Sequence, residues 1–250
     1  MTDALHNYQS AWARKPVLRI IYDDFYRRLA AAAVPGLTIE IGGGIGNLKQ
    51  RLSNVVTTDV QHAHWLDCVA DAQSLPFGAN TASNIVMVDV LHHIEFPAIF
   101  FHEAERILRP GGRILMVEPA ITWGSTLFYR LLHQEPVRTS EDPLKEGMPD
   151  PKRDPYESNQ AIPTLIATRY RDAFHTRYPN LQIRRVAWFS FAAYPLSGGF
   201  KPWGLIPRIL VEPLLAVERK FESALGRLAG FRMMLVIEKR SATAPTSTAD

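Results

Sequence analysis

The sequence predicts an α/β fold with a doubly wound, mostly parallel sheet, and three observations support this prediction. Short apolar runs alternate with helix-compatible stretches between residues 37 and 118. The runs are apolar throughout, as expected of strands that are buried on both faces. The chain has 250 residues, of which 46% are hydrophobic and 21% charged, and these values suit one ordinary globular domain. We therefore expect helices on both faces of the sheet and a single domain over residues 1–240.

The individual elements follow from periodicity and from turn residues. The expected strands are residues 37–41, 55–59, 85–88, 113–118, 181–191 and 231–239. Apolar residues at helical spacing predict helices over 17–33, 47–52 and 163–178, and the first of these ends before Pro35 and Gly36. Residues 1–36 are accordingly interpreted as a helical cap that precedes the core of the domain at 37–118.

The second half of the chain departs from this regular alternation. Prolines gather among charged residues in 121–160, which predicts a lid insertion on the surface. Residues 161–240 form the substrate-side half, with an extra helix near 207–229. Apolar residues that share one face of this helix are Leu210, Leu214, Val217, Phe221, Leu225 and Leu228. The small and polar residues 241–250 predict a disordered tail.

Composition and charge restrict the cellular setting and the partners. The single cysteine, Cys68, forms no internal disulfide, and no apolar run approaches the roughly 20 residues of a spanning helix. Residues 1–16 do not resemble a secretory signal, so we expect a cytoplasmic protein. Residues 151–250 hold 15 Lys and Arg against 8 Asp and Glu, whereas residues 1–150 hold 13 against 17. This basic half favours either a solvated face or an anionic partner, which could be nucleic acid, a phosphorylated substrate or a membrane surface in peripheral contact.

A glycine loop directly follows the first expected strand. Gly42, Gly44 and Gly46 let the backbone turn sharply and approach a ligand closely. The dinucleotide fingerprint, started at Gly42, requires a third glycine where this chain has Asn47. The Gly-Lys-Ser/Thr ending of a phosphate loop is also absent. The loop therefore predicts a ligand site and weakens both of these nucleotide-binding alternatives.

Four ordered elements resemble the class I S-adenosylmethionine (SAM)-dependent methyltransferases. The pattern E-x-G-x-G-x-G over residues 40–46 is similar to their first motif, and Asp59 follows at the end of the second strand. Residues 71–72, 85–94 and 106–113 resemble the later motifs in the same order. The resemblance is to the type 11 branch, covers about residues 37–118, and implies a Rossmann-like SAM-methyltransferase fold with a seven-stranded sheet.

The same resemblance implies that SAM is the cofactor and assigns roles to several residues. It places Asp59 at both ribose hydroxyls, Asp71 and Ala72 at the adenine edge, and Glu40 near the ammonium group. A carboxylate suits two hydroxyl donors because it accepts several hydrogen bonds. The positions expected to bind the cofactor are Glu40, Gly42, Gly43, Gly44, Gly46, Asp59, Val60, Asp71, Ala72 and Asp89. No histidine or cysteine spacing suggests a metal site.

Methyl transfer is an in-line displacement, and an oxygen nucleophile usually also needs a general base. His92 and His93 follow the fourth strand, where ligands of open α/β sheets bind. His133 and Glu135, in the expected lid, form a second acid/base pair of candidates. We expect O-methylation of a small-molecule or lipid-linked acceptor, and no dense Lys/Arg cluster indicates nucleic acid.

Some alternatives remain open at this point. Apolar residues between 188 and 206 predict a substrate tunnel, a membrane-surface patch or simply core. A catalytically silent protein that binds SAM or a partner is the alternative to an enzyme. A nucleotide-dependent oxidoreductase is a third class, which predicts tighter binding of NAD(P)H than of SAM.

Overall fold

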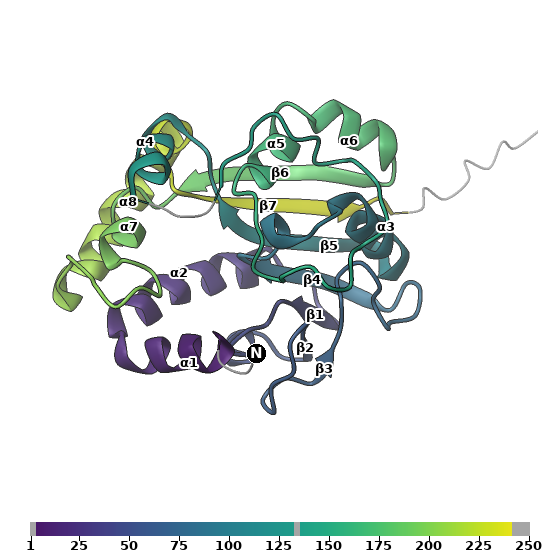
Figure 1. The fold of residues 1–250 in the computed structure, drawn as a ribbon, viewed down its shortest axis with the longest axis horizontal. Coiled ribbons are helices and arrows are strands. Elements are labelled where there is room, and N and C mark those ends of the chain that lie inside the picture. The colour runs from purple at the N-terminus through teal and green to yellow at the C-terminus, as the bar shows by residue number, and fades with distance from the viewer. Residues whose placement is uncertain (1–3, 133–135, 242–250) are drawn as a thin grey trace, which may run out of the picture.

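The computed structural model describes residues 4–132 and 136–241, and seven strands within them form one sheet (Figure 1). The strands are β1 (Thr38–Ile41), β2 (Val55–Asp59), β3 (Cys68–Val69), β4 (Ala82–Val88), β5 (Leu108–Pro119), β6 (Leu181–Phe189) and β7 (Arg232–Lys239). Their order is β3-β2-β1-β4-β5-β7-β6. The first five strands are mutually parallel, whereas β7 runs antiparallel to both β5 and β6. The doubly wound, mostly parallel seven-stranded fold is therefore confirmed.

Helices cover both faces of this sheet (Figure 1). The helices α1 (Ala4–Arg14), α2 (Pro16–Ala32), α7 (Ala193–Ser197) and α8 (Arg208–Ala229) lie on one side, and α3 (Pro97–Ile107), α5 (Ile162–Ala167) and α6 (Arg171–Arg177) lie on the other. The helix α4 (Trp123–Leu132) lies beside α8. Within the described residues, no helix combines the length and the apolarity needed to cross a membrane.

Strand alternation divides the core into two clusters, one on each face of the sheet. In β4, Ile85 and Met87 belong to the cluster beneath α3, α5 and α6, whereas Val86 belongs to the cluster beneath α2 and α8. Successive side chains of a strand point to opposite faces, so a strand buried on both faces is apolar at every position. This burial explains the continuous apolar runs of the sequence.

Several elements differ from those that periodicity predicts. The helix expected over 47–52 is only a 3₁₀ turn at Leu48–Gln50. The helix expected over 163–178 is divided into α5 and α6, because Thr168 leaves the helical conformation with φ −124° and ψ −91°. The helix α4 lies in 121–160, where no regular element was expected, and β3 has only two residues, too few for an apolar pattern.

The orientation of α8 also differs from what its apolar pattern suggests. Its buried residues are Val211, Leu215, Glu218 and Gly226, whereas most of the apolar residues on the predicted face are exposed. At 100° per residue, the buried and apolar sectors are offset by roughly a quarter turn. The predicted apolar face therefore exists, but it faces solvent.

Two contacts fix α8 in this orientation. A Cβ atom at Gly226 would lie 2.3 Å from the carbonyl oxygen of Trp188, so the helix backbone packs directly on β6. The buried Glu218 carboxylate accepts hydrogen bonds from the backbone N–H groups of Phe191, Ala192 and Ala193 at 3.1, 2.6 and 2.8 Å. These bonds satisfy backbone donors at the start of α7. The Gly226 contact and the Glu218 hydrogen bonds together turn this side of α8 inward.

We expect Gly226→Ala to lower the free energy of unfolding by about 1–3 kcal/mol, because the added methyl group collides with the β6 backbone. Helix propensity alone predicts the opposite sign, a gain of about 1 kcal/mol. Urea unfolding measures the change, with Ser223→Ala at an exposed position of the same helix as the control. Stabilisation by Gly226→Ala would contradict the close packing of α8 on β6.

Candidate active site

A cavity of about 940 Å³ opens where the parallel strands β1, β2 and β4 end. The predicted site residues on its walls are Glu40, Gly42, Gly43, Gly44, Asp59, Val60, Asp71, Ala72, Asp89, His92 and His93. Gly46 belongs to the same loop but is not on the cavity wall. His133 and Glu135 lie outside the described residues. In the part of the chain that is described, no group of three or more His, Cys, Asp or Glu side chains is placed to hold a metal ion.

The glycine loop adopts the backbone conformation for which glycine is needed. Gly42 and Gly44 have φ values of 63° and 49°, in the left-handed region. A Cβ atom at Gly42 would also lie 2.4 Å from Val90 Cγ2. The indole Nε1 of Trp65 donates to the Gly44 carbonyl oxygen at 2.8 Å and fixes the loop from outside. The loop backbone is therefore exposed to the cavity without intervening side chains.

Asp59 lies at the end of β2, beside the glycine loop. One carboxylate oxygen accepts a hydrogen bond from the Gly44 N–H at 3.1 Å, and the other accepts one from the Gln61 N–H at 2.9 Å. Burial raises the pKa of Asp59 above its ordinary value, and the backbone donors oppose this rise. Each oxygen has a second lone pair, so the carboxylate can accept further hydrogen bonds from a ligand in the cavity.

Glu40 supplies a second carboxylate at the end of β1. It is 4% exposed, and its Oε2 atom has no hydrogen-bond partner among the described residues. Burial raises its pKa to about 8. A buried acceptor without a donor costs free energy, so this site favours a ligand that brings a donor or a positive charge. The ammonium group of SAM fits that requirement.

Asp71 and Ala72 form the next part of the wall. Asp71 Oδ1 accepts a hydrogen bond from the Gln73 N–H at 2.8 Å, and the Asp71 carbonyl oxygen accepts one from Ser74. Ala72 is buried. The turn therefore presents one carboxylate and one small apolar side chain to the cavity.

The carboxylate of Asp89 is bound by two residues that sequence reasoning missed. Arg232 pairs with both of its oxygens, with Nη2 3.1 Å from Oδ2, and the Tyr22 hydroxyl donates to Oδ2 at 2.9 Å. The Arg232 guanidinium also lies 3.9 Å from the centre of the Tyr194 ring. Since β7 is antiparallel, its first residue reaches the edge where the parallel strands end, opposite Pro119 of β5. Sequence reasoning missed Arg232 because periodicity does not reveal the direction of β7.

His92 and Glu118 form a buried pair beside the cavity. His92 Nδ1 lies 2.7 Å from Glu118 Oε2, and Oε1 of Glu118 accepts from the N–H groups of Val90 and Leu91. Because the carboxylate is an acceptor, it favours the tautomer with a proton on Nδ1 and a lone pair on Nε2. Glu118 is the penultimate residue of β5, and sequence reasoning did not assign it to the site.

His93 lies beside this pair, with its ring 4.1 Å from that of His92. Its Nδ1 atom lies 3.3 Å from the Glu157 carbonyl oxygen, and its own carbonyl oxygen accepts from Arg153 at 2.7 Å. These contacts link the turn after β4 to the segment around residues 153–157, which also lines the cavity.

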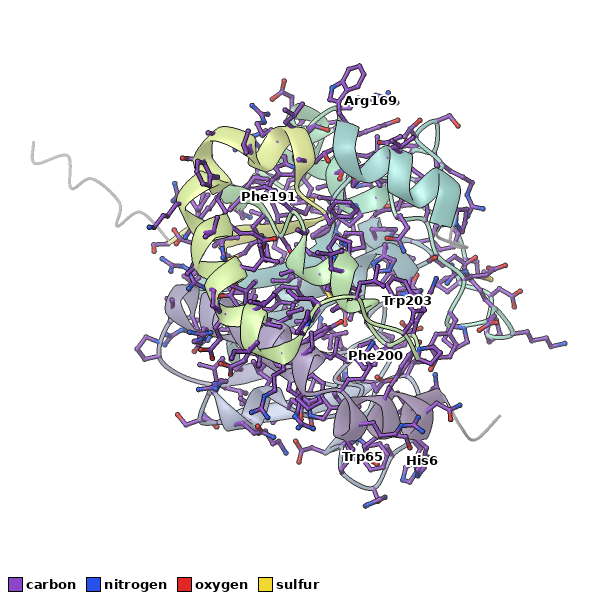
Figure 2. All side chains as sticks on the ribbon, turned by 90° about the vertical axis from the view of Figure 1, so that its left-hand side faces the viewer. His6, Trp65, Arg169, Phe191, Phe200 and Trp203 are labelled. Carbon is purple, nitrogen blue, oxygen red and sulfur yellow. The ribbon has the colours of Figure 1, made fainter. Side chains whose placement is uncertain are left out.

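The opposite wall comes from α1 and from the loop that joins α7 to α8. Figure 2 shows Phe200 and Trp203 on this loop, and the Phe200 ring lies 4.9 Å from that of Tyr8. The Lys15 ammonium group fastens the loop by contacts of 2.6–2.9 Å to four carbonyl oxygens, those of Ser197, Gly199, Lys201 and Trp203. This wall is aromatic, whereas the wall formed by the strand ends is acidic.

Comparisons with known proteins agree with this geometry. Residues 39–116 match a family described as methyltransferase domain. No curated protein matches the chain at a significant level. Among solved structures, a SAM-dependent methyltransferase from Thermotoga maritima superposes with a TM-score of 0.52 and 13% identity, covering 86% of this chain and 89% of that one. Another from Archaeoglobus fulgidus gives a TM-score of 0.50 and 13% identity, with 89% and 94% covered.

At these identities the two structures support the fold, while the domain match and the ordered motifs support the activity. The strand order with its antiparallel β7, the left-handed glycine loop and the two acids at the ends of β1 and β2 agree with both. Residues 39–116 of this chain therefore match a methyltransferase domain, and the whole chain has the fold of the class I SAM-dependent methyltransferases.

Proposed function

We propose that the enzyme transfers the methyl group of SAM to an oxygen atom of a small-molecule or lipid-linked acceptor that binds in the cavity described above. The observation that carries this proposal is the arrangement of one cavity: Glu40 and Asp59 lie on one wall, and the His92–Glu118 pair adjoins it. The acidic wall suits a cationic cofactor, and the His92–Glu118 pair suits removal of a proton.

Four side chains and the glycine loop of the cavity would hold SAM. The Asp59 carboxylate would accept the ribose hydroxyls, Glu40 would face the ammonium group, and Asp71 with Ala72 would border the adenine. The bare backbone of Gly42–44 allows the ligand to approach closely. When bound, SAM supplies an electrophilic methyl group on its sulfonium. The residues of the chain then have to align the acceptor and exclude water.

His92 is the residue we assign as general base. With Nδ1 oriented by Glu118, its Nε2 lone pair would take the proton of an acceptor hydroxyl. Glu118 is a positioning residue, because both its oxygens are directed to His92 and to the turn after β4. His93 has a different role in this proposal: it connects that turn to residues 153–157.

The acceptor class follows from the opposite wall. Tyr8, Phe200 and Trp203 line the cavity with aromatic surface, which suits an apolar or ring-bearing acceptor. Lys201 of the same loop and Lys152 also line the cavity, and they suit an acceptor with an anionic group. A lipid-linked acceptor combines both features.

Asp59→Ala should weaken SAM binding by about 100-fold, because two charge-assisted hydrogen bonds to the ribose are lost. Calorimetric titration with SAM measures the affinity, and circular dichroism checks that the variant folds. Asp23→Ala, which removes an acid from α2 outside the cavity, serves as the control and should bind normally. Unchanged affinity in Asp59→Ala would exclude the ribose assignment.

SAM affinity should rise with pH between pH 6 and pH 7, by at most about tenfold. The pKa of Glu40 is about 8 in the unliganded enzyme, so the carboxyl group must lose a proton to receive a cation. An α-amino group stays protonated over this range. Titrations in buffers of different ionisation enthalpy measure the proton that is released. Glu40→Gln should give a flat profile and no proton release, and a slope equal to that of the wild type would refute the assignment.

His92→Ala should lower turnover by about 10² to 10⁴-fold while SAM affinity stays within about threefold. Turnover is followed as transfer of a radiolabelled methyl group from SAM into lipid and metabolite fractions. Added imidazole should restore part of the activity, because it can occupy the vacated volume. His93→Ala is the matched control and should retain most of its turnover. A larger loss in His93→Ala than in His92→Ala would identify His93 as the base.

A further inference from the structure

Large apolar side chains lie exposed along α8, on α4 and on the loop before α8. Figure 2 views the molecule from the side of α4, α7 and α8. We call this surface the apolar stripe, and it comprises Trp123, Leu127, Leu205, Ile209, Leu210, Val217, Phe221, Leu225 and Leu228. Trp123 is 85% exposed and Ile209 is 81% exposed. Isolated exposed apolar residues are ordinary, whereas a contiguous row of them marks an interaction surface.

The stripe lies on packed elements. A Cβ atom at Gly124 would lie 3.1 Å from the Ala229 Cα atom, so the start of α4 packs closely against the end of α8. The inner sector of α8 is fixed separately by Val211, Leu215 and the Glu218 hydrogen bonds. The hydrophobic core therefore contains none of the stripe residues. They stay exposed although the inner sector of α8 is packed.

The charged side chains beside the stripe indicate which kind of partner it binds. Exposed cations on α8 and on the loop before it are Lys201, Arg208, Arg219, Lys220 and Arg227, of which Arg219 pairs with Asp24, and Glu212 is the exposed acid of the same segment. The other acids of α8 are turned inward: Glu218 accepts backbone hydrogen bonds, and Glu222 pairs with Arg28. An exposed apolar row beside basic residues is the pattern of a helix that lies in the interface of an anionic membrane.

A second copy of the chain fits this surface less well. A two-fold symmetric contact uses the same patch on both partners. It would place the cations Arg208, Lys220 and Arg227 of one copy near those of the other, which costs free energy. An anionic lipid surface instead complements them.

The stripe is also continuous with the rim of the cavity. Trp203 lines the cavity and is 40% exposed, and Leu205, two residues later, belongs to the stripe. The Leu205 N–H donates to the Leu196 carbonyl oxygen at 2.7 Å, and Lys15 fixes the preceding loop. A surface that contacts the stripe would therefore lie beside this rim.

We propose that the apolar stripe docks the enzyme on an anionic phospholipid surface, with the Trp203 rim of the cavity directed towards the lipid. Docking itself does not depend on the proposed function. Only its consequence, that the acceptor reaches the cavity from the membrane, rests on that function.

The test is cosedimentation with vesicles of phosphatidylcholine alone or with about 30% phosphatidylglycerol. The wild type should bind the anionic vesicles and bind the neutral ones less. The double variant Val217→Asp/Phe221→Asp should lower the partition coefficient at least about tenfold. The matched control Ala216→Asp/Ser223→Asp adds the same charge to exposed positions of the same helix outside the stripe, one turn before Lys220 and Arg227. It should lose only the electrostatic part of binding, and therefore lose less than the stripe variant. Lys220→Gln/Arg227→Gln should reduce the preference for anionic vesicles.

Three outcomes would overturn the proposal. One is a wild type that binds neither kind of vesicle, and another is an equal loss in the stripe variant and its matched control. The third is a dimer, detected by light scattering, that Val217→Asp/Phe221→Asp dissociates, since a second copy would then occupy the stripe. SAM titration of every variant checks the fold. Because vesicle binding is measured without acceptor, its failure is distinct from failure of the methyl-transfer proposal.

Discussion

An ion pair between the buried Arg232 and the partly exposed Asp89 joins the two halves of the chain at the edge of the sheet where the cavity opens. Arg232 is 3% exposed, and burying a guanidinium costs free energy unless its charge is paired. The pair exists because β7 enters antiparallel between β5 and β6. Tyr22 of α2 completes it, so one interaction connects α2, the cofactor-binding half and the last strand.

The two walls of the cavity are built differently, and the difference is consistent with the chemistry of methyl transfer. Glu40 and Asp59 are held by the ends of adjacent parallel strands, where the backbone has little freedom. The aromatic wall depends on a loop that Lys15 holds through four carbonyl oxygens. A cofactor that is the same in every turnover suits the strand ends, and an acceptor that varies among enzymes suits a loop.

The helix α8 has three sectors with different surroundings. Its inner sector packs on β6 through Gly226 and caps α7 through Glu218, its basic side chains lie at the surface, and its apolar stripe is exposed. Amphipathic periodicity ordinarily predicts which side of a helix is buried. In α8 it fails, because a close backbone approach and a buried carboxylate decide the orientation instead.

The sequence by itself determined the elements whose signal is local. Continuous apolar runs predicted the main strands, and the glycine loop after the first of them predicted a ligand site where the strands end. The cofactor and the roles of Glu40, Asp59 and Asp71 were what the resemblance to class I methyltransferases implied. Tertiary structure alone decided the rest. The partners of Asp89 and His92 lie 143 and 26 residues away, and only strand direction brings Arg232 and Glu118 to them. The exposure of the α8 stripe likewise depends on the approach of Gly226 to Trp188, a contact between distant segments that periodicity does not encode.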